Sequence, residues 1–183
     1  AEASEPVLEL VNRMDAPVSS SLMGQGSFDN TDPRYMGMLG MHGTVTAAKA
    51  IAECDLFIGL GTRFSDRVIG DKATFAKNAK ILQIDIDPAE VNKNIAVDLA
   101  LIGDVKAVLE QLLPLLPQQE HTQWMEQIQS WKKEYPLVMT AEDSEAVTPQ
   151  DIIQTLDELT HGDAIITTEV GQPQMWAAQF YQF

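Results

Sequence analysis

Three short groups of glycine, acidic and arginine residues have the composition of a nucleotide-binding site. Each follows an apolar run typical of a buried strand: GLGTR at residues 59–63, DIDP at 85–88 and GDV at 103–105. Glycine lets the backbone approach a ligand closely, a carboxylate accepts hydrogen bonds from ribose hydroxyls, and arginine pairs with phosphate. Because ligands bind beyond the carboxyl ends of parallel strands, the three groups predict one shared ligand site.

Each group taken alone also has a structural interpretation. Asp104 and Asp87 can each cap a following helical turn, and Gly61 can serve a tight turn. No complete G-x-G-x-x-G is present, so the sequence shows no dinucleotide fingerprint. The recurrence of such groups at three consecutive strand ends favours a ligand site.

Two further segments carry possible chemistry. The loop GMLGMHGT at residues 37–44 combines glycines, methionines that can contact flat rings, and His42. His42 could carry a proton, contact a ligand or hold the loop, and no second histidine or cysteine lies nearby at zinc-ligand spacing. The segment RFSDR at residues 63–67 fits either an anion-binding patch or a surface ion pair, and spacing alone does not choose between them.

The composition narrows the class of partner. The 183 residues include 12 basic and 27 acidic ones, for a formal net charge of −15. Such a surface repels nucleic acid and anionic lipid, and no apolar run approaches the roughly 20 residues of a membrane helix. Cys54 is the single cysteine and lies among apolar residues, which indicates a small buried side chain in a reducing, cytoplasmic setting.

The surrounding pattern predicts an α/β fold, a doubly wound and mostly parallel sheet with helices on both faces. We expect a first helix capped by Ser4, a loop over residues 24–43, and a strand at 56–60 that is buried on both faces. The expected strands are residues 17–22, 56–60, 80–86 and 99–102, and the expected helices are residues 45–53, 105–116 and 118–135.

Composition shifts divide the chain into two units. Residues 1–139 form an incomplete first domain that lacks its first strand, and the acidic stretch 140–147 is a linker. Residues 148–183 begin a second, truncated domain with a helix starting at Thr148 and Pro149 and a strand over residues 164–168. Both ends of the chain look cut. It opens on a helix with no preceding strand, and it stops at Phe183, directly after a strand and the start of another helix.

The order of these motifs resembles the catalytic subunit of the acetohydroxyacid (acetolactate) synthase family. Its middle domain is matched by GMLGMHGT at residues 37–44, GLGTRFSDRVIG at 59–70, QIDIDPAEVNKN at 83–94 and GDVKAVL at 103–109. The opening of its thiamine-diphosphate domain is matched by VGQPQMWAAQ at residues 170–179. The similarity covers almost the whole chain, and related pyruvate oxidases and glyoxylate carboligases fit these motifs less well.

The resemblance implies a transferase that condenses two 2-ketoacids, pyruvate with pyruvate or with 2-ketobutyrate, with loss of carbon dioxide. Its product is acetolactate or acetohydroxybutyrate, in branched-chain amino-acid biosynthesis. The implied cofactors are FAD, thiamine diphosphate and Mg²⁺, and the FAD is structural or vestigial because the net reaction is not a redox reaction. The implied assembly is a homo-oligomer, dimer or tetramer, with a regulatory small subunit.

The resemblance also assigns roles to residues by position. The matches to FAD-contacting positions are Ser21, Leu22, Met23, Leu39, Gly40, Met41, His42, Gly61, Arg63, Arg67, Asp85, Ile86, Asp104 and Val105. Met41, Asp66 and Arg67 match the substrate channel, where Arg67 would hold the carboxylate of the second ketoacid. Gln172 would touch the thiamine diphosphate, and Met175 would pack under the bent thiamine.

Some features of the family do not match this chain. Pro173 stands where the family usually has histidine, and Ser65 replaces a frequent aspartate. The glutamate that activates thiamine, the metal-binding motif and the glycine-rich turn that grips FAD have no counterpart here. We therefore expect no catalytic residue and no metal ligand within the chain, and no activity from the chain alone.

Two other functions remain open at this point: a stand-alone nucleotide- or flavin-binding module, and another enzyme that uses FAD and thiamine diphosphate, such as a pyruvate oxidase. Because the glycine-rich turn is absent, we expect weak or no retention of FAD by the isolated chain. Because a sheet without its first strand exposes backbone and apolar surface, we also expect self-association.

Overall fold

The computed structural model describes residues 2–139 and 146–183 and confirms the α/β class. Its strands form two parallel sheets. The smaller sheet pairs β1 (Val18–Ser20) with β2 (Tyr35–Met38). The larger sheet has the order β3 (Leu56–Leu60), β4 (Lys80–Asp85), β5 (Leu99–Ile102). β1 and β3 do not pair with each other, so the strands are divided between two sheets.

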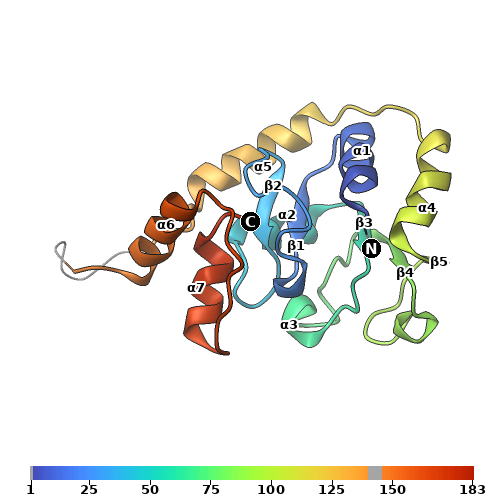
Figure 1. The fold of residues 1–183 in the computed structure, drawn as a ribbon. Helices are drawn as coiled ribbons and strands as arrows, with labels where there is room; N and C mark the ends of the chain where they lie inside the picture. Colours follow the sequence, from blue (N-terminus) through green and yellow to red (C-terminus); the bar gives the residue numbers. More distant parts are fainter. Residues whose placement is uncertain (1, 140–145) are drawn as a thin grey trace.

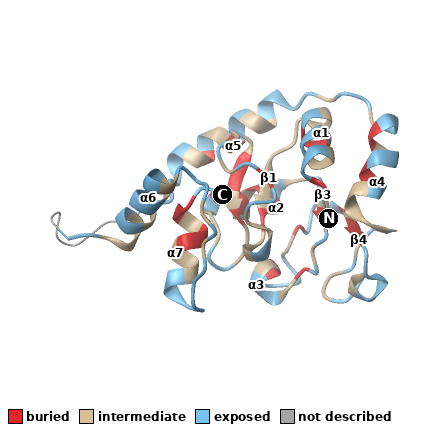
Figure 2. Ribbon diagram, in the orientation of Figure 1, coloured by how far each residue is buried: buried red, intermediate tan, exposed pale blue. Residues whose placement is uncertain are grey.

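Helices cover both faces of the larger sheet, as the sequence predicts (Figure 1). Side chains alternate between the faces of a strand. Accordingly, Ile81 of β4 packs toward α2 (Val45–Glu53) and α3 (Asp66–Ile69). Ile84 faces the other way and packs under α1 (Ser4–Met14) and α4 (Val105–Leu112). Buried residues accordingly gather on the strands and on the inward faces of these helices (Figure 2).

Local capping explains where the helices begin. The Thr44 hydroxyl accepts a hydrogen bond from the backbone N–H of Ala47 at 3.1 Å and starts α2. The Asp104 carboxylate accepts from the N–H groups of residues 106 and 107 and starts α4. α2 then presents two alanines to its neighbours, which lets α5 (Thr122–Glu134) pack closely against it through Ile128 and Trp131. On α5 itself, the rings of Trp124 and Trp131 meet edge to face at 5.7 Å.

Several predicted boundaries are wrong. Ala3, and not Ser4, occupies the N-cap of α1. The predicted loop over residues 24–43 contains β2, and a short 3-10 helix, η1 (Leu22–Gly24), begins where the predicted strand over residues 17–22 should end. The strand at residues 56–60 is not buried on both faces as predicted, because only Gly59 in it is buried and Leu56 is exposed. It lies at the edge of its sheet. α4 changes at Leu112 to a 3-10 turn, η3 (Leu113–Leu115), because Pro114 has no N–H for an α-helical bond.

The predicted second unit is only partly as expected. Most of the proposed linker, residues 140–145, lies outside the described residues. α6 (Pro149–Thr160) begins with a capping box between Thr148 and Asp151, which confirms the predicted helix start. Residues 164–168 form no strand, because no neighbouring strand pairs with them, and Ile165 is 96% exposed.

The last helix, α7 (Gln172–Phe180), packs against the first part of the chain (Figure 1). The Gln25 side-chain amide donates to the carbonyl of Ala178 at 3.2 Å, and Gln179 donates to the carbonyl of His42 at 2.8 Å. The tail therefore contacts the loop that precedes α2. Among the residues described, no helix has the length and apolarity needed to cross a bilayer.

Cys54 should react slowly with alkylating reagents. Burial, aided by the neighbouring charge of Asp55, raises the pKa of the Cys54 thiol to about 11, so the reactive thiolate is scarce at neutral pH. At pH 7.5 we expect iodoacetamide to modify the folded chain at least about tenfold more slowly than the urea-unfolded chain, with the rate rising as pH approaches the raised pKa. Mass spectrometry measures both rates, and equal rates would contradict the assigned burial.

Candidate ligand site at the carboxyl ends of the strands

The carboxyl ends of β3, β4 and β5 meet at one edge of the larger sheet. The N–H of Gly61 donates to the carbonyl of Ile84 at 2.8 Å, and the N–H of Gly103 donates to the carbonyl of Asp85 at 2.9 Å. A side chain on Gly61 would contact Val105 at 3.9 Å. The three chemical groups singled out in the sequence are therefore neighbours in space.

The acidic residues of this edge differ in what they already bind. Asp85 is 7% exposed, and one of its carboxylate oxygens accepts from the N–H of Asp87 at 3.0 Å. The other oxygen makes no hydrogen bond among the described residues. Asp104 and Asp87 cap α4 and the 3-10 turn η2 (Pro88–Glu90), so their structural interpretations are confirmed. Asp87 and Asp104 likewise use one carboxylate oxygen each, so among the described residues all three acids keep a second oxygen that could accept from a ligand.

The glycine-rich loop lies against α3. The N–H of Met41 donates to the carbonyl of Arg67 at 2.9 Å, and the Arg67 guanidinium lies 3.7 Å from the Met41 sulfur. Gly40 has φ 112°, and a side chain there would collide with the carbonyl oxygen of Arg67. The two side chains proposed for a substrate channel, Met41 and Arg67, are therefore brought together, and Asp66 begins α3 beside them.

The alternative of a surface ion pair in RFSDR is wrong for the described residues. No ion pair between described residues includes Arg63, Asp66 or Arg67, and the side chains of all three are exposed. Neither guanidinium has an acidic partner among the described residues, so both can pair with an anion.

The smaller sheet ends beside the same loop. The N–H of Leu39 donates to the carbonyl of Ser20 at 2.8 Å, which joins the end of β1 to the loop after β2. Ser21 and Leu22 follow directly, and Met23 is 88% exposed. Ile86 follows β4 and is also exposed, at 70%. These exposed apolar side chains border the strand ends without packing into the core.

Two residues that support the edge were not singled out from the sequence. Gln83 is fully buried in β4, and its side-chain amide donates to the carbonyl of Thr62 at 3.0 Å, which holds the turn after β3. Phe64 is 2% exposed, with φ 48°, and anchors the segment between the two arginines. A polar residue inside the apolar run KILQID was a visible signal for Gln83, whereas nothing in the spacing marks Phe64.

The predicted thiamine-diphosphate contacts lie on α7. Gln172 is exposed in its first turn and Met175 is half-buried, whereas the contact with His42 is made by Gln179 in the last turn. The structure therefore brings the far end of α7, and not Gln172 itself, to the glycine-rich loop.

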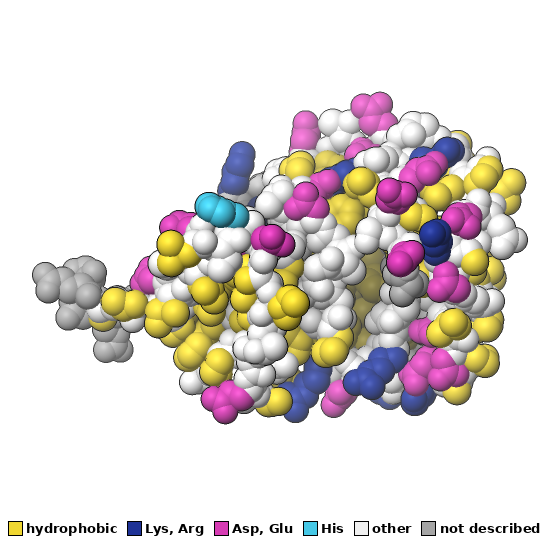
Figure 3. Space-filling model, in the orientation of Figure 1, with side chains coloured by type: hydrophobic (Ala, Val, Ile, Leu, Met, Phe, Trp, Pro, Cys, Tyr) yellow, Lys and Arg dark blue, Asp and Glu magenta, His cyan; other side chains and the backbone are white. Residues whose placement is uncertain are grey.

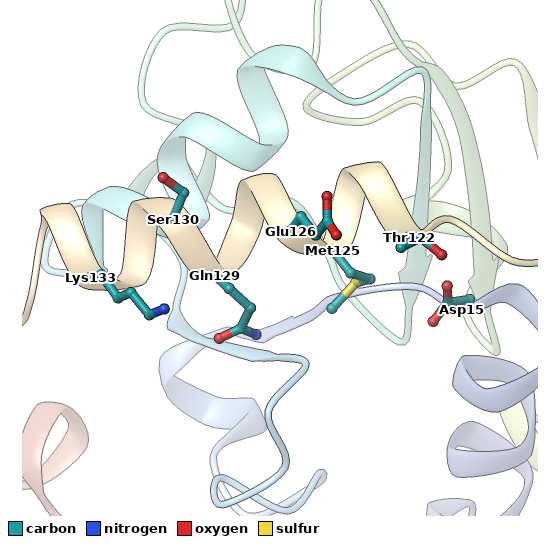
Figure 4. A pocket seen from close by; sticks show the side chains of 7 residues that line it. All are labelled: Asp15, Thr122, Met125, Glu126, Gln129, Ser130 and Lys133. Atoms are coloured by element: carbon teal, nitrogen blue, oxygen red, sulfur yellow. The ribbon is translucent and has the colours of Figure 1, made fainter.

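A surface hollow lies elsewhere. It runs along α5 and is lined by polar side chains and one methionine (Figure 4), namely Asp15, Thr122, Met125, Glu126, Gln129, Ser130 and Lys133. A neighbouring hollow shares Asp15 and Thr122. Neither contains a predicted site residue, and the described residues hold no cluster of three metal-ligating side chains. The strand edge remains the better candidate.

Parallel strands with helices on both faces, and glycines and acids gathered at the carboxyl ends, define a Rossmann-like α/β class of protein. The chain belongs to the family described as thiamine pyrophosphate enzyme, central domain, whose model matches residues 1–112.

Individual relatives extend the likeness over the rest of the chain. An acetolactate synthase large subunit from Cyanidium caldarium is 46% identical over 187 residues, covering 98% of this chain and 32% of the relative. Another from Haemophilus influenzae is 40% identical over 189 residues, covering 100% and 33%. An acetolactate synthase from Mycobacterium leprae is 40% identical, covering 100% and 30%. The chain thus spans about a third of the length of these relatives.

Proposed function

We propose that the chain is the FAD-binding middle part of an acetolactate synthase, followed by the opening of its thiamine-diphosphate domain. The whole enzyme would condense two 2-ketoacids with loss of carbon dioxide. The observation that carries the proposal is the 40–46% identity to proteins of this name across 98–100% of the chain. The gathering of the same motifs at one strand edge supports it independently.

The strand edge fits the chemistry of FAD in three respects. Gly61 has positive φ and no side chain, and a side chain there would meet only Val105, at 3.9 Å, so the backbone beside it is open to a flat ring or a phosphate. Asp85 has a free carboxylate oxygen, the acceptor that a ribose hydroxyl needs. The unpaired guanidinium of Arg63 follows the same turn and would pair with the diphosphate.

The remaining proposed FAD contacts divide between the two sheets. Ser21, Leu22 and Met23 follow β1, while Leu39, Met41 and His42 follow β2, so these residues would meet the flavin end. Ile86, Asp104 and Val105 follow the larger sheet and would meet the adenosine end. Bound there, the flavin would supply a rigid flat surface without taking part in electron transfer.

Arg67 would place the second ketoacid. Its guanidinium has no acidic partner among the described residues and lies beside the exposed side chain of Met41. It would pair with the ketoacid carboxylate and fix its direction, while Met41 would contact the apolar part. Asp66 would set the charge balance at the entrance of the same channel.

The rest of the proposal concerns the whole enzyme. Gln172 and Met175 would contact thiamine diphosphate, whose chemistry requires a magnesium ion held outside this chain. Pro173 has no N–H to offer that cofactor. The division into residues 1–139, a linker at 140–147 and residues 148–183 belongs to the same proposal. A homo-oligomer in the cytoplasm with a regulatory small subunit also belongs to the proposal, and the name large subunit among relatives supports the small-subunit partner.

A chimera tests the activity. The matching segment of the Haemophilus influenzae relative is replaced by this chain, and acetolactate formation from pyruvate is measured together with oxygen uptake. We expect acetolactate without oxygen uptake, and at least about a tenfold rise in KM for Arg67→Lys, because lysine cannot replace a bidentate guanidinium. Arg13→Lys is the matched control and should leave KM unchanged, because the half-buried Arg13 of α1 already pairs with Glu9 at 2.8 Å and is no part of the proposed site.

Peroxide production by a folded chimera would instead favour an oxidase and contradict the proposal. If the chimera does not assemble, titration of the unaltered chain with FAD gives a second readout. Weak, saturable quenching of flavin fluorescence supports the site, and no quenching at millimolar FAD contradicts it.

A further inference from the structure

Met41 and Arg67 are joined through their backbones as well as through their side chains. The N–H of Met41 donates to the carbonyl of Arg67 at 2.9 Å, and the Arg67 guanidinium donates to the Met41 sulfur at a nitrogen–sulfur distance of 3.7 Å. The loop around Met41 is closed in turn, since the N–H of Gly43 donates to the carbonyl of Gly40 at 2.9 Å. Because the backbone holds the two residues together, sulfur and guanidinium stay neighbours although both side chains are exposed.

The other methionines near the strand ends differ from Met41. Met36 and Met38 of β2 are buried, with 7% and 5% of their surface exposed. Met41 is 65% exposed and Met23 is 88% exposed, but no basic side chain among the described residues donates to the Met23 sulfur. Figure 3 shows basic side chains along the border of the molecule where α3 lies, with hydrophobic side chains exposed beside them. Met41 thus combines an accessible sulfur with a guanidinium neighbour.

An accessible thioether is open to oxidation by a small peroxide. A sulfur lone pair attacks one peroxide oxygen, the oxygen–oxygen bond breaks, and the departing hydroxide takes up the proton of the transferred oxygen and leaves as water. The sulfur loses two electrons and becomes a sulfoxide, and the peroxide is reduced. Methionine sulfoxide reductases return the sulfoxide to the thioether, so the change is reversible.

We propose that Met41 is a reversible oxidation site whose sulfoxide holds the Arg67 guanidinium. A thioether is a weak acceptor, whereas an oxygen acceptor facing a cationic donor makes one of the stronger hydrogen bonds. The new oxygen extends one bond from the sulfur, so rotation of the exposed side chains brings it within the about 2.7–3.2 Å of an N–H···O bond. No acidic side chain among the described residues competes for the guanidinium.

The consequence for activity rests on the proposed function, in which Arg67 pairs with the carboxylate of the second ketoacid. A guanidinium that already holds the sulfoxide has one N–H fewer for that carboxylate. Loss of one charge-assisted hydrogen bond lowers affinity about tenfold. Oxidation of Met41 would therefore raise the KM for the ketoacid, and the reductase would restore it.

Arginine reactivity tests the contact without an activity assay. The full chain is treated with dilute hydrogen peroxide, the Met41 sulfoxide is quantified by peptide mass spectrometry, and the exposed arginines are then modified with phenylglyoxal. We expect Arg67 to react at least about fivefold more slowly after oxidation, because its guanidinium is engaged. Arg63, exposed in the same segment, is the internal reference and should keep its rate.

Two variants assign the effect. In Met41→Leu, peroxide should leave the reactivity of Arg67 unchanged, whereas in Met23→Leu it should still lower it. If Met41→Leu does not fold, treatment of the oxidised unaltered chain with a methionine sulfoxide reductase gives the same comparison. Recovery of Arg67 reactivity supports the proposal, and its absence after complete reduction of Met41 contradicts it.

Three further results would overturn the proposal. These are a folded chain in which peroxide oxidises Met23 but leaves Met41 reduced, an Arg67 that reacts equally before and after oxidation, and an equal fall in Met41→Leu. In the chimera, a rise in KM for pyruvate after oxidation supports both the contact and the role of Arg67. Slowed Arg67 modification with unchanged KM would support the contact and count against that role, so the two failures are distinguishable.

Discussion

Replacing Phe64 by alanine should lower the free energy of unfolding by about 3–5 kcal/mol. The Phe64 ring is 2% exposed and lies 5.8 Å from the ring of Phe57 and 6.1 Å from that of Phe75. It belongs to the cluster that holds α2 and α3 against β4. Because Phe57 is held in β3 and Ile69 in α3, the cavity left by the substitution cannot collapse fully.

The loss of unfolding free energy in Phe64→Ala should be measured by urea unfolding followed through tryptophan fluorescence. Leu115→Ala is a suitable control, because this apolar side chain is 78% exposed and its removal should cost no more than about 0.5 kcal/mol. Both variants delete apolar atoms, so the difference between their losses in unfolding free energy reflects the burial of the Phe64 side chain. A loss below about 1 kcal/mol at Phe64 would show that its cluster does not stabilise the sheet.

The effect of Phe64→Ala should also reach the candidate site. Phe64 lies between Arg63 and the start of α3, and its backbone adopts φ 48°, which a side chain rarely takes unless packing compensates. Without the ring, the segment from Arg63 to Arg67 loses its anchor on the sheet. Site residues far more exposed than Phe64 therefore depend on it for their positions.

Local signals predicted much of the fold. The bounds of α2 follow the sequence, because Thr44 provides a cap and alanines form the helix. α6 begins where Thr148 and Asp151 complete a capping box. The cores of β3, β4 and β5 were visible as apolar runs. In each case the information lies within a few consecutive residues.

Strand pairing was harder to predict because it depends on distant residues. β2 has the sequence YMGM, with a glycine and no β-branched residue, and it is a strand because β1 lies beside it. Residues 164–168 have a stronger strand composition but no partner, and they form no strand. The separation into two sheets follows from the same cause, since β1 and β3 lack a common neighbour.

The candidate site was predictable at the level of strand ends. Glycines and acids directly after apolar runs were correctly placed at one edge, because parallel strands bring their carboxyl ends together. The contacts between Met41 and Arg67, and between His42 and Gln179, join segments 26 and 137 residues apart. No spacing rule predicts such contacts, so the sequence could suggest the loop but not what it touches.

Replacing Gly40 by alanine should detach the glycine-rich loop from α3. The added carbon would collide with the carbonyl oxygen of Arg67, which accepts the hydrogen bond from Met41, and φ 112° is strained for any side chain. Neither the loop nor the helix backbone can yield without breaking that bond. We expect a loss of about 1–3 kcal/mol in stability, and exchange of the Met41 amide at least about tenfold faster.

Gly70→Ala separates the two causes. Gly70 also has positive φ, at 60°, but a side chain there would meet nothing within 4 Å. Gly70→Ala should therefore lower the free energy of unfolding only by the conformational cost of a side chain at positive φ, about 1 kcal/mol. It should leave exchange of the Met41 amide unchanged. If Gly40→Ala and Gly70→Ala behaved alike in both thermal unfolding and Met41 exchange, backbone strain alone would explain them. The close approach of loop and helix would then have no role in placing Met41 beside Arg67.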